Sequence, residues 1–323
     1  MRTREEFDAF LREQIAPKLR GLESQRRAAI SAARVDHRWK LALAGVGIIC
    51  FFATRELWYG AVPLALPWLI EGYRKLRAAH TFAPVIRGAL LQPAIEFWDP
   101  SFRYRSDQGI AQAEFDASRL FSGETYNRYS GEDLVTGRHG ATEFRFSELR
   151  VEHVTRRNKE DHTRVVFRGL FFVADFNKSF QGQTLVLPDQ AEASFGTLGR
   201  AFQSLSSAFG NLSLVQLESP EFERCFVVRS SDPTEARYLL SPSLMERLLR
   251  FRHKTGSGLR LAFLGGRLCV AMPIAVDHFR VNAFAPVTLD DVRRWASDLL
   301  FAISIVDDLD LNTRIWSKTS PAA

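Results

Sequence analysis

The sequence predicts an α+β fold: an N-terminal amphipathic helix, a hairpin of two apolar helices, and then an antiparallel-rich sheet with packed helices. Three observations favour this class. Apolar residues recur at helical spacing near the N-terminus. Two uncharged runs follow each other within residues 41–70. After residue 133, short segments rich in Val and Phe alternate with glycine turns, which is typical of antiparallel strands.

The first segment, residues 1–40, is predicted to be a cytoplasmic helix. Thr3 and Glu6 have the spacing of a capping box at its start. One apolar stripe follows at spacings of three and four residues, formed by Phe7, Leu11, Ile15, Leu19 and Leu22. The stripe either packs on the soluble domain or forms a short coiled coil that makes a homodimer, and both interpretations stay open here.

Residues 41–70 predict a transmembrane hairpin. Leu41–Thr54 and Leu57–Ile70 carry no charge, and only Arg55 and Glu56 separate them. Each run of 14 residues would form a helix of about 21 Å, shorter than the roughly 30 Å hydrocarbon core of a bilayer. A single span, a re-entrant or interfacial segment and a soluble core hairpin are therefore the alternatives.

The positive charge of the chain is concentrated on both sides of this apolar stretch. The chain has a net charge of +6, of which residues 1–40 contribute +4 and residues 71–87 contribute +3, whereas residues 88–323 carry −1. Such flanking charge is typical of a cytoplasmic membrane border, whereas a nucleic-acid-binding domain would carry it on the folded part. The basic residues predicted to flank the membrane are Arg34, Arg38, Lys40, Arg74, Lys75 and Arg77. The sequence thus predicts the inner (cytoplasmic) membrane, both termini in the cytoplasm, the lipid bilayer as a partner and no nucleic acid.

The three cysteines, Cys50, Cys225 and Cys269, favour a reducing compartment. Their number is odd and no two form a CxxC pair, which argues against a disulfide framework and a cysteine zinc site. We also expect no secretory signal peptide, because the first 40 residues read as a charged helix.

Residues 71–323 are predicted to form the cytoplasmic α+β domain. A helix is expected at Phe82–Gln92, and another, followed by a loose connection, within residues 190–213. Predicted strands are Glu143–Val154, Val165–Val173, Leu185–Leu187, Leu214–Leu217 and Cys225–Val228, with a hairpin turning at Gly265–Gly266. Two further helices are expected, one between Ser241 and Gly256 and one from Thr288 to Val306.

Several strings in this domain are similar to one known family. They are FRGLFFVADFNKSF at 167–180, TLVLPD at 184–189, SGEDLVTG at 130–137, EARYLLSPSLMERL at 235–248 and LNTRIW at 311–316. The chain resembles, from about Phe115 to Trp316, an uncharacterised bacterial family catalogued as domain of unknown function 3137. The resemblance implies a membrane-associated bacterial protein with paired apolar segments. It implies no activity, and no catalytic residues are carried over.

Motifs that would identify an enzyme are weak in this sequence. His153 and His162 flank an acidic loop, but solvated loop residues are the simpler interpretation. The glycine-rich segment 121–140, with the acidic pair Glu132 and Asp133, lacks the phosphate-loop pattern and is better explained by turns. No metal or cofactor is therefore predicted. The polar-site candidates, which border a very apolar strand, are Arg168, Asp175, Asn177 and Lys178.

The sequence thus favours a membrane-tethered binding or scaffold module over an enzyme. Other membrane or cytoplasmic proteins would be its partners. The alternatives are an enzyme with an unrecognised active site and an accessory subunit of a larger membrane complex.

Overall fold

The computed structural model describes residues 3–54, 57–157, 160–176, 178–189, 212–274 and 285–312. The chain divides into two compact units. Unit 1 comprises Met1–Trp98 and Phe279–Trp295, and unit 2 comprises Asp99–His278 and Ala296–Ala323. The helix expected within residues 190–213 lies almost entirely outside the described residues.

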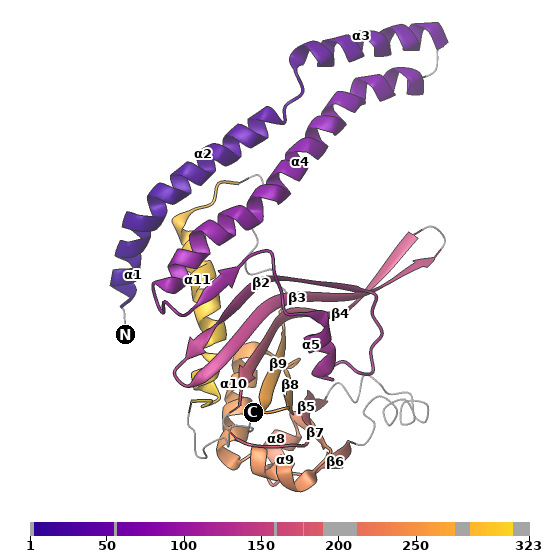
Figure 1. Cartoon of the computed structure of the whole chain (residues 1–323). Helices are drawn as coiled ribbons and strands as arrows, with labels where there is room; N and C mark the ends of the chain where they lie inside the picture. The colour runs from indigo at the N-terminus through magenta and orange to yellow at the C-terminus, as the bar shows by residue number, and fades with distance from the viewer. Residues whose placement is uncertain are drawn as a thin grey trace, which may run out of the picture. The chain divides into compact units, whose positions relative to one another are not determined.

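Unit 1 is helical. Its helices are α1 (Arg4–Phe10), the π-helical turn η1 (Leu11–Ile15), α2 (Ala16–Ala32), α3 (His37–Thr54), α4 (Leu57–Glu96) and the first part of α11 (Leu289–Ile303). Helices α2 and α3 both pack along α4 (Figure 1). Within this unit, α3 and the first turns of α4 form an antiparallel helical hairpin.

The N-terminal stripe is buried within the chain. The capping box is present: Thr3 Oγ1 accepts from the Glu6 N–H at 3.2 Å, and a Glu6 carboxylate oxygen accepts from the Thr3 N–H at 2.8 Å. The Phe7 ring lies 5.4 Å from that of Phe97 and 5.3 Å from that of Trp98, at the end of α4. Leu11, Ile15 and Leu19 are buried on the same stripe. A homodimer through this helix stays a prediction.

The predicted transmembrane hairpin is wrong. Among the residues that the structure describes, no helix combines the length and the apolar character needed to cross a membrane. The two helices exist, but their boundaries do not coincide with the apolar runs. Helix α3 begins with His37 and includes Arg38 and Lys40, while α4 continues past Ile70 through Glu71. Because polar residues occupy these turns, the prediction of an integral membrane protein is corrected as well.

Unit 2 contains a large antiparallel sheet, so the predicted α+β class and antiparallel-rich sheet agree with the structure. The strand order is β1-β2-β3-β4-β9-β8-β5-β7-β6. The strands are β1 (Arg103–Arg105), β2 (Arg128–His139), β3 (Thr142–Arg157), β4 (Glu160–Asp175), β5 (Thr184–Pro188), β6 (Ser213–Val215), β7 (Phe226–Ser230), β8 (Arg260–Leu264) and β9 (Arg267–Pro273). The helices are α5 (Gln112–Ala117), α8 (Pro220–Glu223), α9 (Pro233–Leu239), α10 (Pro242–Thr255), the second part of α11 and α12 (Ile305–Asp308).

Both faces of this sheet carry phenylalanines. On one face, Phe115 of α5 packs with Phe121, Phe167 and Phe171 in a buried cluster. Side chains alternate between faces along a strand, so three other phenylalanines point the opposite way. The rings of Phe144, Phe146 and Phe172 stack there, with centroids 6.1 to 6.3 Å apart. Many of the phenylalanines of unit 2 are thus explained as core.

Candidate functional site

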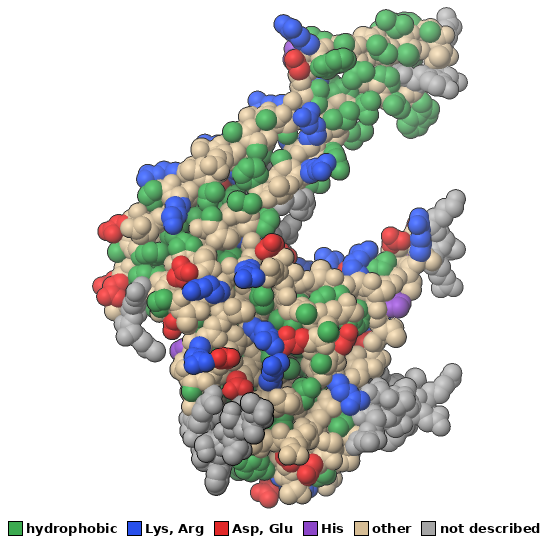
Figure 2. Space-filling model, in the orientation of Figure 1, with side chains coloured by type: hydrophobic (Ala, Val, Ile, Leu, Met, Phe, Trp, Pro, Cys, Tyr) green, Lys and Arg blue, Asp and Glu red, His purple; other side chains and the backbone are tan. Residues whose placement is uncertain are grey.

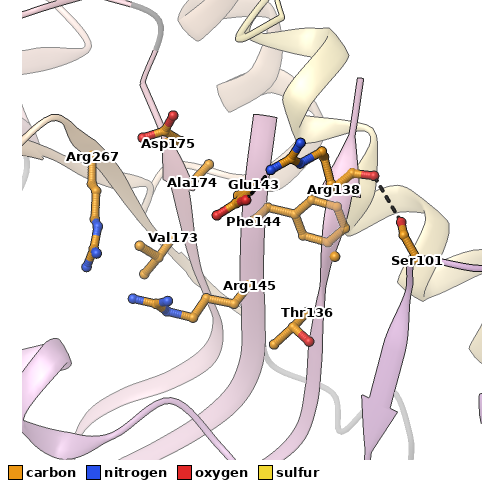
Figure 3. A pocket seen from close by; sticks show the side chains of 11 residues that line it. Ser101, Thr136, Arg138, Glu143, Phe144, Arg145, Val173, Ala174, Asp175 and Arg267 are labelled. Carbon is orange, nitrogen blue, oxygen red and sulfur yellow. Dashed lines mark hydrogen bonds and ion pairs between the residues drawn. The ribbon is translucent and has the colours of Figure 1, made fainter. Parts of the chain in front are cut away.

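A hollow in unit 2 lies over β2, β3, β4 and β9. Its volume is about 370 Å³, near the lower end of the roughly 300–1,000 Å³ found for small-molecule sites. Figure 3 shows its lining, which comprises Ser101, Thr136, Gly137, Arg138, Glu143, Phe144, Arg145, Val173, Ala174, Asp175 and Arg267. Charged side chains from four different strands therefore converge over a partly apolar floor.

Two guanidinium groups form one end of this pocket. Arg145 of β3 lies opposite Val173 of β4, and Arg267 begins β9 on the other side of β4. Figure 3 shows the two guanidinium groups pointing toward one another beside Val173. Both reach Glu114 of α5: Arg145 Nε lies 3.0 Å from each carboxylate oxygen, and Arg267 Nη1 lies 3.8 Å from Oε1. The Glu114 carboxylate thus contacts both guanidinium groups at this end of the pocket.

Two carboxylates form the other end. Glu143 precedes Phe144, and Asp175 follows Ala174, the cross-strand partner of Phe144. Since side chains alternate along a strand, Glu143 shares a face with Arg145 and Asp175 shares it with Val173. Glu143 forms an ion pair with Arg138 of β2. Asp175 lies opposite Arg267 in the β4–β9 register. The pocket therefore separates charge along β3, with the cationic end at Arg145 and the acidic end at Glu143.

A buried thiol lies next to the cationic end. Cys269 of β9 pairs with Val173, and burial, with a smaller contribution from the Glu114 charge, raises the pKa of this thiol to about 12. A thiol reacts through its thiolate, so Cys269 is protonated and inert at neutral pH and serves as core.

The predicted polar-site candidates do not form one site. Asp175 lines the pocket, and Asn177 lies outside the described residues. Lys178 Nζ donates to the carbonyls of Tyr238 and Leu239 at 2.7 and 3.2 Å, and burial lowers its pKa. The Lys178 ammonium group therefore provides hydrogen bonds to the backbone carbonyls at the end of α9 rather than to a ligand.

Arg168 lies elsewhere, on the part of the sheet where β2, β3 and β4 carry arginines. It is half-buried and directly opposite Arg150. The Arg150 guanidinium is held by the buried Glu152, whose carboxylate accepts from Arg150 Nε at 2.6 Å and also pairs with Arg128. Among the described residues, the Arg168 guanidinium has no such carboxylate partner. Like charges directly opposite each other weaken a strand pair.

Apart from Asp175, the charged residues that build the pocket were missed by the sequence reasoning. Glu143 and Arg145 alternate on one predicted strand, which indicates a shared face. Arg267 and Glu114, however, reach that face only through the order of strands and the position of α5. No local spacing connects them with β3.

Asp133 of the acidic pair, and His153, have hydrogen-bond partners that explain them as structural residues of the sheet. Asp133 is buried, with φ of 61°, at an irregularity in the β2–β3 register, and its carboxylate accepts a hydrogen bond from the Tyr104 hydroxyl. His153 pairs with Arg164 and its Nδ1 lies 3.1 Å from the Thr125 carbonyl. Within the described ranges, no group of three or more His, Cys, Asp or Glu could hold a metal ion.

A second candidate surface lies on the α3–α4 hairpin of unit 1. Figure 2 shows hydrophobic side chains gathered over this hairpin. Ile49, Phe52 and Trp58 are 69%, 74% and 77% exposed. The other large exposed apolar residues on these helices include Trp39, Leu41, Ile48, Val62, Leu66, Trp68, Leu69 and Ile70. A contiguous apolar surface of this kind is typical of an interaction site.

The basic residues predicted to flank the apolar runs separate into two groups. Lys40 and Lys75 both pair with the buried Glu71, each at 2.5 Å. The Lys40 pair connects α3 to α4, whereas Lys75 lies one turn after Glu71 on α4 itself. The hydrogen bond from Lys40, followed by that from Lys75, lowers the pKa of Glu71 to about 2. Four of the predicted residues stay exposed, namely Arg34, Arg38, Arg74 and Arg77.

Arg74 and Arg77 border an open hollow of about 410 Å³ between α2 and α4. Its other walls are mainly alanine: Ala29, Ala32, Ala33 and Ala78, with Thr81 and Phe82. This side of unit 1 therefore combines apolar surface with positive charge.

The described residues thus define an α+β protein with a charged pocket in unit 2 and an exposed apolar surface on the α3–α4 hairpin. Residues 165–311 match the family described as "Protein of unknown function (DUF3137)", which confirms the resemblance predicted from the sequence. No curated protein matches the chain.

One solved structure resembles part of the chain, the crystal structure of the mycobacterial trehalose monomycolate transport factor A, TtfA. It is 12% identical, with a TM-score of 0.29, and the match covers 62% of this chain and 88% of that chain. A similarity of this strength supports no conclusion about function.

Proposed function

We propose that this protein is a binding module held against the cytoplasmic surface of a lipid bilayer by the α3–α4 hairpin, without crossing the bilayer. The observation that supports this proposal is the exposed apolar surface of the hairpin. Large apolar side chains are normally buried on folding, and a patch left exposed is usually covered by a partner.

A bilayer surface fits this patch better than a single protein groove does. Exposed apolar residues occur on both helices, from Trp39 on α3 to Ile70 on α4, so a planar apolar medium covers more of them than one groove can. Trp39, Trp58 and Trp68 are exposed on this hairpin, and tryptophan settles at the level of lipid head groups. Anionic lipids also attract the exposed arginines at its base, each contributing about 1 kcal/mol near the surface.

The affinity expected from the apolar side chains is substantial. Complete burial of a large apolar side chain contributes about 1.5–3 kcal/mol. Phe52 and Ile49 are roughly three-quarters exposed, so each would contribute about 1–2 kcal/mol when it enters the interface. Several such residues together contribute more binding free energy than a single acyl chain, which alone gives marginal and reversible membrane binding.

The test is sedimentation of the full chain with vesicles of neutral or anionic phospholipid. We expect the protein to sediment with both and more strongly with the anionic vesicles. The double variant Ile49→Glu, Phe52→Glu should stay in the supernatant. The control is Leu214→Glu, at a 57% exposed apolar position of β6 in unit 2, which should bind like the natural chain.

Failure of the natural chain to bind any vesicle, or unchanged binding by the double variant, would refute the proposal. Its orientation is tested separately in cells. Reporter fusions at Met1 and at Ala323 that are active only in the periplasm should both be silent, because a hairpin that enters one leaflet leaves both ends on the same side.

A further inference from the structure

The pocket over β2, β3, β4 and β9 is independent of the hairpin, because all its lining residues belong to unit 2. We propose that it binds a small zwitterion that carries one phosphate or carboxylate group and one ammonium group.

The cationic end has hydrogen-bond donors to spare. A guanidinium group has five N–H donors. Arg145 uses Nε and Nη2 on Glu114, and Arg267 reaches the same carboxylate only at 3.8 Å. Among the described residues, the Arg267 guanidinium makes no hydrogen bond. Arg145 and Arg267 share the Glu114 carboxylate, and an anionic group between the two guanidinium groups would accept hydrogen bonds from both.

The acidic end repels a second anion and favours a cation. Glu143 and Asp175 are neighbours on adjacent strands with their carboxylates on the same face, an arrangement that is unfavourable for like charges. Arg138 contacts Glu143, and the pair is exposed to solvent. An ammonium group between Glu143 and Asp175 could donate hydrogen bonds to both carboxylates.

The strand geometry sets the size of the ligand. Glu143 and Arg145 are two residues apart on β3, so their Cα atoms are separated by about 6.7 Å. A ligand with its two charges a few bonds apart, such as phosphoethanolamine, fits this separation and the pocket volume. The apolar floor at Val173 would contact the carbons between the charged groups.

The same chemistry occurs in a free metabolite and in a phospholipid head group. Titration calorimetry on the full chain distinguishes them, with phosphoethanolamine as the free monoester and glycerophosphoethanolamine as the head group released from its acyl chains. Inorganic phosphate and ethanolamine are the single-charge probes. We expect one or both zwitterions to bind at least tenfold more tightly than either single-charge probe. The zwitterion that binds more tightly identifies whether the natural ligand is a free metabolite or a phospholipid head group.

The variants separate the two ends of the pocket. Arg267→Gln should weaken zwitterion binding by roughly 10- to 100-fold, the effect of losing a hydrogen bond to a charged group. Glu143→Gln should weaken zwitterion binding and strengthen phosphate binding. The matched control is Arg164→Gln on β4, whose arginine is 52% exposed against 56% for Arg267 and pairs with Glu124 outside the pocket.

Three results would overturn the proposal: no binding of either zwitterion at millimolar concentration, phosphate binding as tightly as the zwitterions, or equal losses in Arg267→Gln and Arg164→Gln. Vesicle binding by the hairpin should be the same in all these variants, so failure here is distinguishable from failure of the proposed attachment.

Discussion

Phe115 is a buried position of the unit 2 core, and its replacement by alanine tests how α5 is held on the sheet. Phe115 is 2% exposed. Its ring lies 5.0 Å from that of Phe121, 5.3 Å from Phe171 and 5.7 Å from Tyr129. Since neighbours from several segments line the site, it cannot collapse easily, and the loss should reach about 3–5 kcal/mol. For a domain of this size each kcal/mol lowers the melting temperature by about 2–4 °C, so the transition should fall by roughly 6–20 °C.

The assay is thermal unfolding of the full chain followed by circular dichroism. Leu214→Ala is the control, because truncation of an exposed side chain changes stability by no more than about 0.5 kcal/mol. A decrease below about 3 °C for Phe115→Ala would refute the packing argument. Because Glu114 precedes Phe115 on α5 and holds Arg145, the same variant should also weaken zwitterion binding when measured below its melting temperature.

Three further predictions concern single charged or reactive groups. The ionised Glu71, whose pKa is lowered to about 2, stabilises the hairpin at pH values above the ordinary carboxyl pKa of 4.5, and this contribution is lost as the pH falls toward about 2. The denaturant midpoint of Glu71→Gln should therefore approach that of the natural chain as the pH falls through this window. A constant difference between the two midpoints would contradict the prediction. Arg168→Gln removes the like charge opposite Arg150 and should leave stability unchanged or raise it by about 0.2–1 kcal/mol; a clear loss in denaturant stability would show that Arg168 has a stabilising partner. Thiol titration at neutral pH should label Cys50 and Cys225, which are partly exposed, and label Cys269 only after unfolding; rapid labelling of all three would disprove its burial.

The sequence was informative where a property depends on neighbours along the chain. The capping box at Thr3, the buried stripe from Phe7 and the strand Val165–Val173 all depend on short-range periodicity, and the structure has a helix or strand at each. The sheet order could not be predicted in this way. Strand β4 pairs with β9, and β5 lies between β8 and β7. These pairs join segments that are far apart in the sequence, so short-range periodicity does not specify them.

The hairpin shows how an apolar pattern can be over-interpreted. The absence of charge in Leu41–Thr54 was read as a span, although 14 residues reach only about 21 Å as a helix. The structure includes Arg38 and Lys40 in α3 and pairs Lys40 with Glu71 of α4. That ion pair connects residues 31 positions apart, so no local count of charges could have revealed that the basic flank fastens the hairpin.

The pocket was not predicted for the same reason, and its geometry depends on one close contact between strands. Gly169 of β4 lies opposite Pro273 of β9, and a Cβ there would stand 2.0 Å from the Met272 carbonyl oxygen. Gly169→Ala must therefore separate the strands whose register sets Asp175 opposite Arg267.

Gly265→Ala provides the matched control for this contact. Gly265 has φ of +56° with nothing within 4 Å of the added carbon, so only the left-handed conformation is penalised, by about 1–2 kcal/mol. We expect Gly169→Ala to lower the denaturant midpoint far more than Gly265→Ala and to abolish zwitterion binding in whatever fraction folds. Equal midpoints for the two variants would show that β4 and β9 can move apart freely, and the register of these strands could then not be what holds the two ends of the pocket in place.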